Sequence, residues 1–486
     1  MRNVIVRLDQ ILSEAKSIDV EISGIACDSR HVQQGNVFVA ISGSNQDGSA
    51  YIDAAIAKGA VAIVSDKPYP ASLTNAVPYI KVLDARIALS QMSAQFYAGQ
   101  PQTIVAITGT SGKSSVAEFV RQIFAKCGHQ AACVGTLGIT TDHGIEYGTL
   151  TTPDAVSLHK TLQSLHQQGV THLAMEASSH GIEQHRLDGV KLAVCAFLNL
   201  GRDHLDYHQT MDAYFAAKMK LFDMAAVSKS NAAVVNLDGE RGEQAAQYAR
   251  DHGLNVVTVG KQAHDVTLIH SEQEKFSQKL TIEYQQKRFD VVLPLIGEFQ
   301  TQNALMAAGI VIATGEPAEK VIPLIATLTG VKGRLEQVAI SNGAMIVIDY
   351  AHKPEALMAV LDTLRPYTTG QLVCVMGCGG DRDAGKRPIM GEIAANKADI
   401  VIVTDDNPRT EDPEKIRAAI ISGMKNTKNV FNIADRRHAI ETAITMVKAG
   451  DILIIAGKGH ETGQIIGQIT LPFSDHDVVQ KAVTAR

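Results

Sequence analysis

Short β-branched runs that end in glycine or polar residues recur along this chain, and they constrain its fold more than any other feature. Such runs are typical of strands buried on both faces of a parallel sheet. They lie at positions 103–108, 172–175, 192–198, 232–236, 345–348, 372–376, 400–403 and 452–455. Helical stretches separate most of them, so the pattern predicts an α/β protein whose main sheet is doubly wound.

The length and two breaks in the pattern predict three domains. A chain of 486 residues is several times the commonest domain size. Breaks occur at Gln100-Pro101-Gln102 and at the Gly330 to Arg334 stretch. We expect a small N-terminal α/β domain over 1–99, a central ATPase-like domain with a phosphate loop over 100–331, and a Rossmann-like domain over 332–486. The alternating stretch 280–295 favours antiparallel strands.

Composition narrows the possible partners. Lys and Arg number 45 against 51 Asp and Glu, and the net charge of −6 gives no general field that would hold a nucleic acid or an anionic membrane. The first residues reach charge too soon for a signal peptide, and no apolar run is long enough to span a membrane. We therefore expect a cytoplasmic protein with no nucleic-acid partner and no membrane span.

The segment Gly109-Thr110-Ser111-Gly112-Lys113-Ser114-Ser115 is the sharpest local motif. It lies between a predicted strand at 103–108 and a predicted amphipathic helix at 116–126. In such phosphate loops, glycines turn backbone N–H groups toward phosphates, the lysine reaches the β- and γ-phosphates, and the hydroxyl ligates magnesium. The motif is a shortened variant, because Ile107 stands where the full pattern has glycine. The alternative is an ordinary glycine-rich turn between strand and helix.

A second group of polar residues follows two predicted strands of the central domain. Glu176 and Ser178 end one strand, and the Asn199 to Asp206 stretch, which contains His204, ends the next. A carboxylate and an imidazole there could share a metal, although a lone histidine is more often structural. Lys218 is by itself indistinguishable from an ordinary helix-surface lysine.

Polar segments also follow the predicted strands of the last domain. They are Asp349 to His352, Gly379 to Arg382, Asp405 to Arg409, and Gly457 to Glu461. Ligands of open α/β sheets bind beyond the carboxyl ends of the strands, so these segments are predicted to meet at one edge. Pro408 stiffens its loop, and Arg409 offers a planar fork suited to a carboxylate. A solvated surface turn is the alternative for that segment.

These motifs together resemble the Mur ligase family along the whole chain. The resemblance is carried, in order, by Gly109 to Ser114, Glu176 to His180, Asn199 to His204, Ala217-Lys218, Asn303-Ala304, Gly333-Arg334, Asp349 to His352 and Gly457 to Glu461. It implies an ATP-dependent ligase that forms an amide bond in peptidoglycan precursor synthesis. The implied substrates are ATP, UDP-N-acetylmuramoyl-L-alanyl-D-glutamate and meso-diaminopimelate, and a monomer is expected.

The resemblance also implies a role for particular residues. The uridine diphosphate group would contact Ser29, Ser44, Asn45 and Gln46, and the sugar-peptide part would contact Thr151, Thr152, Ser178, Gln184 and Arg186. ATP would be bound by Gly109, Thr110, Ser111, Gly112, Lys113, Ser114, Ser115, Asn303, Arg334, Asp349 and His352. The family pattern has asparagine and threonine at positions 111 and 114; Ser114 keeps the hydroxyl of that threonine, whereas Ser111 lacks the amide of that asparagine.

The family carries a carbamylated lysine, and Lys218 occupies its position. The resemblance implies that magnesium is held by Ser114, Glu176, His204 and Lys218 as N6-carboxylysine, with Lys113, Lys218, His204 and Glu176 catalytic. An ammonium beside magnesium ions is repelled, whereas a carbamate supplies an anionic oxygen ligand.

The implied diaminopimelate site contains Arg382, Asp406, Asn407, Arg409, Gly457 and Glu461. Arg409 would bind the distal carboxylate, which lysine lacks, and Glu461 would suit the adjoining ammonium. The Thr462-Gly463 pair departs from the family pattern, which has an aromatic-containing sequence there. The rivals are a family member that adds lysine, one that adds glutamate to a folate, and a phosphate-loop switch that hydrolyses ATP without forming a bond.

Overall fold

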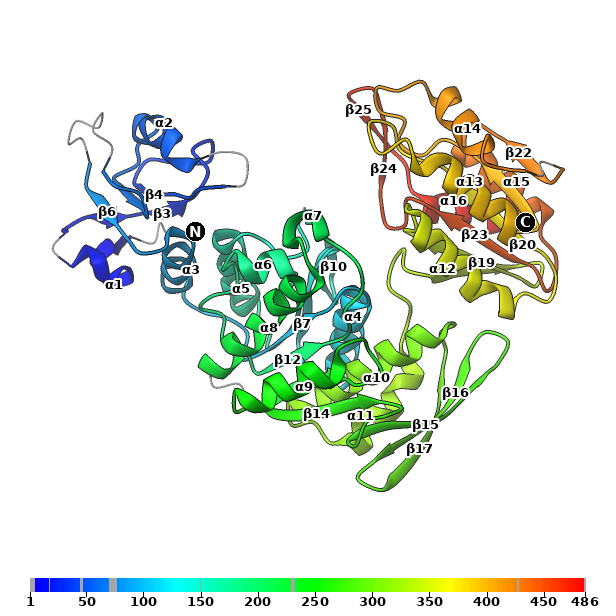
Figure 1. Ribbon diagram of the computed structural model, residues 1–486, viewed down its shortest axis with the longest axis horizontal. Coiled ribbons are helices and arrows are strands. Elements are labelled where there is room, and N and C mark those ends of the chain that lie inside the picture. Colours follow the sequence, from blue (N-terminus) through cyan, green and yellow to red (C-terminus); the bar gives the residue numbers. More distant parts are fainter. Residues whose placement is uncertain are drawn as a thin grey trace. The chain divides into compact units, whose positions relative to one another are not determined.

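The structure is a computed structural model that describes residues 5–16, 18–43, 47–69, 77–148, 150–228, 232–425 and 428–484 (Figure 1). Its contacts divide the chain into two compact units. The first contains Met1–His270, Leu280–Val291 and Gln302–Ile325, and the second contains Ser271–Lys279, Val292–Thr301 and Ala326–Arg486. The predicted α/β class with doubly wound sheets is confirmed.

The N-terminal part of the first unit has a parallel sheet with the strand order β3-β4-β5-β6. A short antiparallel pair, β1 and β2, lies outside it. The elements are β1 (Val6–Arg7), α1 (Leu8–Ile11), β2 (Glu21–Ile22), β3 (Gly24–Ala26), β4 (Asn36–Ala40), α2 (Ile52–Ala57), β5 (Ala62–Ser65), β6 (Tyr79–Lys81) and α3 (Ala85–Phe96). The predicted small α/β domain is thus present.

The central sheet has the strand order β10-β9-β8-β11-β7-β12-β13-β14-β15-β16-β17. Its strands are β7 (Thr103–Thr108), β8 (Ala131–Gly135), β9 (Gly138–Thr141), β10 (Gly144–Glu146), β11 (His172–Glu176), β12 (Val194–Phe197), β13 (Ala232–Asn236), β14 (Asn255–Gly260), β15 (Val266–Gln273), β16 (Gln278–Tyr284) and β17 (Lys287–Leu293). Its helices are α4 (Lys113–Lys126), α5 (Ala155–Gln167), α6 (Ser179–Glu183), α7 (Leu205–His208), α8 (Met211–Val227), α9 (Gly242–Asp251), α10 (Glu298–Ala313) and α11 (Ala318–Leu324).

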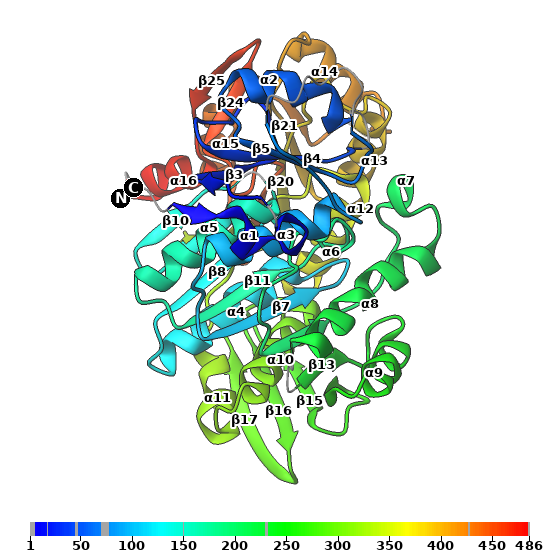
Figure 2. The same ribbon diagram turned by 90° about the vertical axis from the view of Figure 1, so that its left-hand side faces the viewer.

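Strand β7, which leads into the phosphate loop, lies in the middle of this sheet. It pairs in parallel with β11 on one side and β12 on the other, with Glu176 opposite Ile107 and Phe197 opposite Thr108. Figure 2 shows β7 and β11 side by side. Because all three strands end at the same edge, the residues that follow them are brought together.

The local predictions differ from the structure mainly at element ends. Helix α4 begins at Lys113 rather than at position 116, so Lys113, Ser114 and Ser115 belong to its first turn. Strand β12 is shorter than the predicted 192–198. The predicted antiparallel stretch is a hairpin of β16 and β17, joined by Gln285 and Gln286, which both have positive φ as in two-residue hairpin turns.

The second unit contains a sheet with the order β18-β19-β23-β20-β21-β22, parallel except for β18. Its elements are β18 (Glu336–Ser341), β19 (Ala344–Asp349), α12 (Pro354–Leu364), β20 (Leu372–Met376), α13 (Lys386–Lys397), β21 (Ile400–Val403), α14 (Pro413–Ile421), β22 (Val430–Asn432), α15 (Arg436–Met446), β23 (Ile452–Ala456), β24 (Gly463–Ile466), β25 (Ile469–Pro472) and α16 (Asp475–Thr484). Strands β24 and β25 form a separate antiparallel hairpin. The strands predicted at 345–348, 372–376, 400–403 and 452–455 are confirmed.

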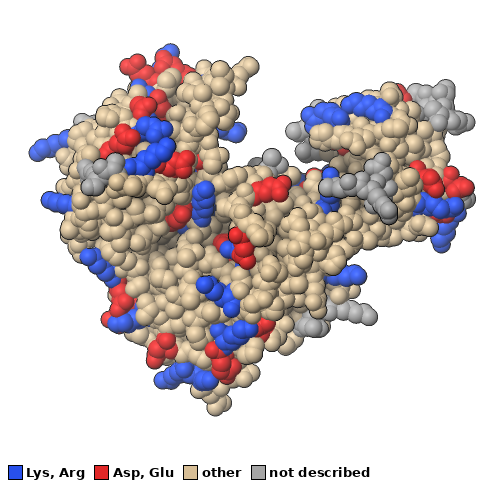
Figure 3. Space-filling model, turned by 180° about the vertical axis from the view of Figure 1, so that it is seen from behind, with Lys and Arg blue, Asp and Glu red and all other residues tan. Residues whose placement is uncertain are grey.

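Basic and acidic side chains are interspersed on the face drawn in Figure 3. The described residues on that face form no continuous basic stripe of the kind that follows a nucleic-acid backbone. Among the described residues, none of the helices combines the length and apolar character needed to cross a membrane.

Candidate active site

The phosphate loop has the backbone that its glycines predict. Gly112 has φ 87°, in the left-handed region that favours glycine, and α4 follows it at once. The first turn of a helix leaves N–H groups without intrahelical partners, and its dipole favours an anion there. Helix α4 is anchored by fully buried Val116, Phe119 and Val120. The loop is therefore built to bind phosphate.

Asn199, which follows β12, holds the loop in place. Its side-chain Oδ1 accepts hydrogen bonds from the backbone N–H groups of Thr110 (3.1 Å) and Ser111 (3.0 Å), and its Nδ2 donates to the Ser111 carbonyl (3.2 Å). The sequence motif contains Asn199, but nothing in it indicates this contact. The Ser111 side chain is exposed, while its backbone is fixed by Asn199.

Lys113 and Lys218 share one acceptor. The Lys113 Nζ donates to the Gly109 carbonyl at 2.8 Å, and the Lys218 Nζ donates to the same oxygen at 2.9 Å. Lys218 lies on α8, is 1% exposed, and is thus not the surface lysine that its sequence suggests. Burial, with a contribution from the charge of Lys113, lowers the pKa of Lys218 from 10.5 to about 6. Its amine is therefore largely uncharged at neutral pH.

Tyr214 is a residue of this site that the sequence did not indicate. Its ring is buried, and its centroid lies 4.2 Å from the Lys218 Nζ. Its hydroxyl accepts a hydrogen bond from the Thr110 hydroxyl at 3.3 Å. Tyr214 thus connects α8 to the phosphate loop one turn before Lys218, at the i, i+4 spacing that places both side chains on one helix face.

The predicted pH dependence of unmodified Lys218 follows from its lowered pKa. Between pH 6 and 10.5 the unfolded chain binds a proton at this lysine that the folded chain does not, so this site makes stability rise with pH. In buffer free of carbon dioxide, Lys218→Met should raise the free energy of unfolding at pH 7 by roughly 2–5 kcal/mol. The gain should shrink as the pH approaches 10.

Urea unfolding at pH 7 and pH 9.5 measures this difference. Lys220→Met is the matched control, because Lys220 lies on the same helix and is exposed. It should leave the stability nearly unchanged at both pH values. An equal gain for Lys218→Met at both pH values would contradict the lowered pKa.

Glu176, at the end of β11, is 2% exposed and is held by Thr136. Its Oε1 accepts from the Thr136 backbone N–H at 2.8 Å, and its Oε2 accepts from the Thr136 hydroxyl at 3.2 Å. Thr136 follows β8, the neighbouring strand, and has no sequence signature. The two bonds fix a carboxylate at the edge of the sheet where the phosphate loop begins.

His204 lies in the left-handed region, with φ 53°, at the start of the short helix α7. Its ring centroid lies 4.8 Å from that of His180, and its Nε2 is 3.5 Å from Asp203 Oδ2. Among the described residues, no group of three or more His, Cys, Asp or Glu side chains is arranged to hold a metal ion. Magnesium usually takes one or two carboxylates together with substrate phosphates, so Glu176 beside a phosphate loop fits that ion.

The residues predicted for the sugar-peptide portion lie together beside Glu176. The Thr152 hydroxyl donates to the Glu176 carbonyl at 2.9 Å and accepts from the Ser178 N–H at 3.0 Å. Arg186 donates to the Thr152 carbonyl at 2.7 Å and to Gln184 Oε1 at 2.7 Å. The Thr151 hydroxyl lies 3.1 Å from that of Thr136. The Ser178 hydroxyl caps α6, which gives it a structural contact that the sequence did not indicate.

The predicted uridine diphosphate residues are only partly within the described structure. Ser29 follows β3 and is half-buried, between Asp28 and Arg30, whose side chains form an ion pair at 2.6 Å. This pair lowers the pKa of Asp28 to about 2. Ser44, Asn45 and Gln46 lie outside the described residues.

The remaining predicted ATP residues divide between the two units. In the first, Asn303 on α10 lies against the phosphate loop, since a Cβ built on Gly112 would be 2.6 Å from Asn303 Oδ1.

The predicted ATP residues of the second unit are Arg334, Asp349 and His352. The Cζ of Arg334 lies 5.1 Å from the centroid of the Tyr350 ring, over which it stacks. Asp349 accepts from the backbone N–H groups of Leu335 and Ala351, at 2.6 and 2.7 Å, and its pKa is raised by burial. The His352 Nδ1–H donates to the Tyr350 carbonyl at 2.8 Å, and burial lowers its pKa.

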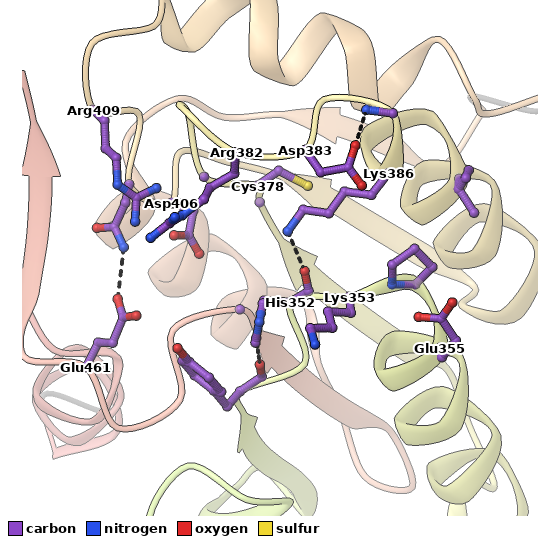
Figure 4. Close-up of a pocket in the computed structure, with 18 residues that line it drawn as sticks. His352, Lys353, Glu355, Cys378, Arg382, Asp383, Lys386, Asp406, Arg409 and Glu461 are labelled. Carbon is purple, nitrogen blue, oxygen red and sulfur yellow. Dashed lines mark hydrogen bonds between the residues drawn. The ribbon is translucent and has the colours of Figure 1, made fainter. Parts of the chain in front are cut away.

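The second unit contains a cavity of about 730 Å³ at the carboxyl ends of its parallel strands (Figure 4). The four polar segments predicted to meet there all contribute to its lining. Its lining residues include His352, Arg382, Asp406, Asn407, Arg409, Gly457 and Glu461. Figure 4 shows Arg382 and Arg409 near Asp406, with Glu461 close by. The cavity therefore offers guanidinium and carboxylate groups side by side.

Arg409 is held by its backbone and partly by its side chain. Its N–H donates to the Ile465 carbonyl at 3.0 Å, and its carbonyl accepts from the Gly467 N–H at 2.7 Å. Both partners belong to the hairpin of β24 and β25. Its Nη1 donates to the Gly380 carbonyl at 2.8 Å, and with respect to the described residues the other guanidinium N–H groups remain for a ligand. Arg409 has φ 50° and is half-buried, unlike an arginine of a solvated turn.

Comparison with known proteins matches three segments of the chain to Mur ligase domains. Residues 21–97 match the domain described as "Mur ligase family, catalytic domain", residues 107–311 the "Mur ligase middle domain", and residues 333–459 the "Mur ligase, glutamate ligase domain". Two similar proteins share the name UDP-N-acetylmuramoyl-L-alanyl-D-glutamate--2,6-diaminopimelate ligase. The one from Bradyrhizobium diazoefficiens is 51% identical over 96% of both chains, and the one from Agrobacterium fabrum is 50% identical over 97% of this chain and 95% of its own.

Solved structures agree with these matches. A structure named for the same ligase is 32% identical, covers 99% of both chains and has a TM-score of 0.73. MurF from Acinetobacter baumannii, at 19% identity, covers 100% of this chain and 99% of its own with a TM-score of 0.65, which shows a shared fold.

The phosphate loop, the fold and these matches place the chain in the Mur ligase family. It is an ATP-dependent enzyme that forms an amide bond, and Mur ligases use ATP with magnesium. The family and the three-domain Mur ligase architecture expected from the sequence motifs are thereby confirmed.

Proposed function

We propose that this enzyme adds meso-diaminopimelate to the D-glutamyl carboxylate of UDP-N-acetylmuramoyl-L-alanyl-D-glutamate in peptidoglycan precursor synthesis. The observation that carries this proposal is the cavity of the second unit, where Arg382 and Arg409 lie near Asp406 and Glu461. One end of diaminopimelate carries both a carboxylate and an ammonium, and the cavity offers a partner for each. The names of the closely similar proteins support the same substrates.

We propose that Arg409 distinguishes diaminopimelate from lysine. Lysine lacks the distal carboxylate, so its binding would leave a partly buried guanidinium without a partner. A defect of this kind amounts to a few kcal/mol, or about two orders of magnitude in specificity. Glu461 would serve the ammonium, while Arg382, Asp406, Asn407 and Gly457 complete the set.

The reaction requires ATP because a carboxylate is a poor acceptor for an amine. The D-glutamyl carboxylate attacks the γ-phosphorus of ATP, and the bond to the β–γ bridging oxygen breaks to give an acyl phosphate and ADP. The amine of the diamino acid then adds to the acyl carbon, loses a proton, and phosphate leaves. Lys113 and the N–H groups at the start of α4 would stabilise charge on the transferred phosphoryl group. Asn303, Arg334, Asp349 and His352 are proposed to serve the nucleotide.

Magnesium would lie near Ser114, Glu176 and His204, and it supplies positive charge to the phosphate oxygens. We propose that Lys218 completes this site as N6-carboxylysine. A buried amine whose pKa is about 6 is largely uncharged at neutral pH and in that form can attack carbon dioxide, whereas an ammonium cannot. The amine nitrogen bonds to the carbon of carbon dioxide and loses a proton, which gives an anionic carbamate.

The remaining substrate is assigned to the first unit. Thr151, Thr152, Gln184 and Arg186, gathered beside Glu176, are proposed to bind the sugar-peptide part together with Ser178. Ser29 and the segment 44–46 are proposed to bind the uridine diphosphate. We assign these tasks to domains over 1–99, 100–331 and 332–486, in a cytoplasmic monomer.

A substrate panel tests the proposal. The purified enzyme is given ATP, magnesium and the UDP-linked dipeptide, with meso-diaminopimelate, lysine or ornithine in parallel, and phosphate release and product mass are measured. We expect a product only with diaminopimelate at low micromolar enzyme concentrations, and kcat/KM for lysine at least about a hundredfold lower.

The rival activities give different results in the same panel. Efficient turnover of lysine would identify a lysine-adding ligase. Phosphate release without the UDP-linked dipeptide or the diamino acid would identify a switch that only hydrolyses ATP. Either outcome would overturn the proposed function.

A further inference from the structure

Lys458 is a fully buried lysine beside the amino-acid cavity. It follows β23, between Gly457 and Gly459, and its side chain is 0% exposed. Its Nζ donates to Asn407 Oδ1 at 3.0 Å and to Glu461 Oε2 at 3.0 Å. A buried ammonium is tolerated only when it is paired and hydrogen-bonded. Its two partners are residues already assigned to the diamino acid, so its position is tied to that site.

The contacts fix the orientation of the Asn407 amide. Asn407 is 5% exposed. Its Oδ1 accepts from Lys458 and also from the Ile465 backbone N–H at 2.9 Å, and its Nδ2 donates to Glu461 Oε2 at 2.9 Å. An ammonium and an N–H can only donate, so the amide oxygen must face them. The amide therefore links the lysine, the carboxylate and the hairpin that holds Arg409.

Glu461 accepts the hydrogen bonds from Lys458 and Asn407 on the same carboxylate oxygen. Lys458 and Asn407 each donate to Oε2, which leaves Oε1 as the oxygen available to a ligand. The side chain is 32% exposed and lines the cavity (Figure 4). Because Lys458 offsets its charge, Glu461 attracts a passing cation less strongly than a lone carboxylate would.

We propose that Lys458 is a positioning residue that sets the choice of amino acid by holding Glu461 and Asn407 in one arrangement. This inference rests on the proposed function. Because Lys458 offsets its charge, Glu461 can orient an ammonium but binds weakly to a ligand that offers only an ammonium. Productive binding therefore also requires the ligand carboxylate that Arg409 binds. Without Lys458, the carboxylate would keep only its bond from Asn407, would be less firmly oriented, and would attract the side-chain ammonium of lysine.

The test is a double-mutant cycle on Lys458→Met and Glu461→Gln, with steady-state kinetics for meso-diaminopimelate and lysine. Lys458→Met should raise the KM for diaminopimelate about tenfold or more and lower the diaminopimelate-to-lysine ratio of kcat/KM about tenfold. The KM for ATP should stay within about twofold. Because Lys458 acts through Glu461, the double variant should be no worse than Glu461→Gln alone.

Two results would overturn the inference: an unchanged KM and substrate ratio in Lys458→Met, or fold-changes that multiply in the double variant. If Lys458→Met does not fold, Lys458→Gln is used, since it keeps a donor and should show a smaller shift in the same direction. Lys397→Met is the matched control, because Lys397 is a lysine of the same unit whose side chain forms an ion pair with the exposed Asp362. It should retain wild-type constants. Wild-type enzyme that fails to use diaminopimelate would overturn the proposed function instead.

Discussion

Arg409→Ala is expected to lower kcat/KM for meso-diaminopimelate by two or more orders of magnitude. Among the described residues, the substitution removes one side-chain hydrogen bond of the fold, the bond to the Gly380 carbonyl, whereas the substrate carboxylate loses its charged partner. Removal of one member of a desolvated charge pair leaves the other unpaired, and such losses amount to about 2–5 kcal/mol.

The loop that carries Arg409 should survive this substitution. The backbone of Arg409 is bonded on both sides to the β24–β25 hairpin, at 3.0 and 2.7 Å, and these bonds do not involve its side chain. Alanine at φ 50° is about as strained as arginine there, because both carry a Cβ. The melting temperature and the KM for ATP should therefore stay near the wild-type values.

The measurement is initial-rate kinetics with diaminopimelate and lysine. Arg409→Lys is the matched variant, and it should recover only part of the activity, because an ammonium cannot make the planar two-point contact of a guanidinium. A wild-type specificity constant in Arg409→Ala would exclude the proposed role.

Lys218→Ala is expected to abolish most turnover, with partial recovery when a small carboxylate such as acetate or propionate is added. The substitution removes the amine that becomes the proposed carbamate and leaves space beside the Gly109 carbonyl. An added carboxylate can occupy that space and supply the missing anionic oxygens. The rate with and without the additive is the measurement.

Two controls separate this effect from a general loss of structure. Lys220→Ala, on the exposed side of the same helix, should behave as wild type. Wild-type enzyme in ¹³C-labelled bicarbonate should show a carbamate signal that Lys218→Ala lacks. Full activity of Lys218→Ala without any additive would remove the carbamate from the mechanism.

The features that the sequence predicts correctly are those that follow from the strand pattern and from local residue spacing. Parallel strands end at one edge, so their order in the sequence is enough to predict that the polar segments after β19, β20, β21 and β23 surround one site. Glycines and the β7-to-α4 order likewise indicated the phosphate loop. The predicted start of α4 is wrong by three positions, because a glycine-rich loop gives no sequence signal for the point where helical backbone begins.

The supporting residues could not be predicted, because their partners lie far away in the sequence. Asn199 bonds residues 88 and 89 positions earlier, Thr136 holds a glutamate 40 positions later, and Lys458 contacts an asparagine 51 positions earlier. A lysine between two glycines reads as a solvated loop residue, and only the packed structure shows it buried. Lys218 is a second lysine whose burial the sequence does not indicate, because the pattern of its helix gives no sign that its amine is enclosed.

The bonds between the β24–β25 hairpin and the loop of Arg409 have an implication for how such enzymes diversify. Arg409 bonds Ile465 and Gly467 of the hairpin through main-chain atoms alone, so the identity of the exposed side chains Ile466, Ile469 and Leu471 is irrelevant to those bonds. Mutations there can accumulate during evolution while the guanidinium keeps its place. The loop and the hairpin thus form one structural unit joined by main-chain bonds. To design a ligase that accepts a different diamine, both segments should be transplanted together from a homologue.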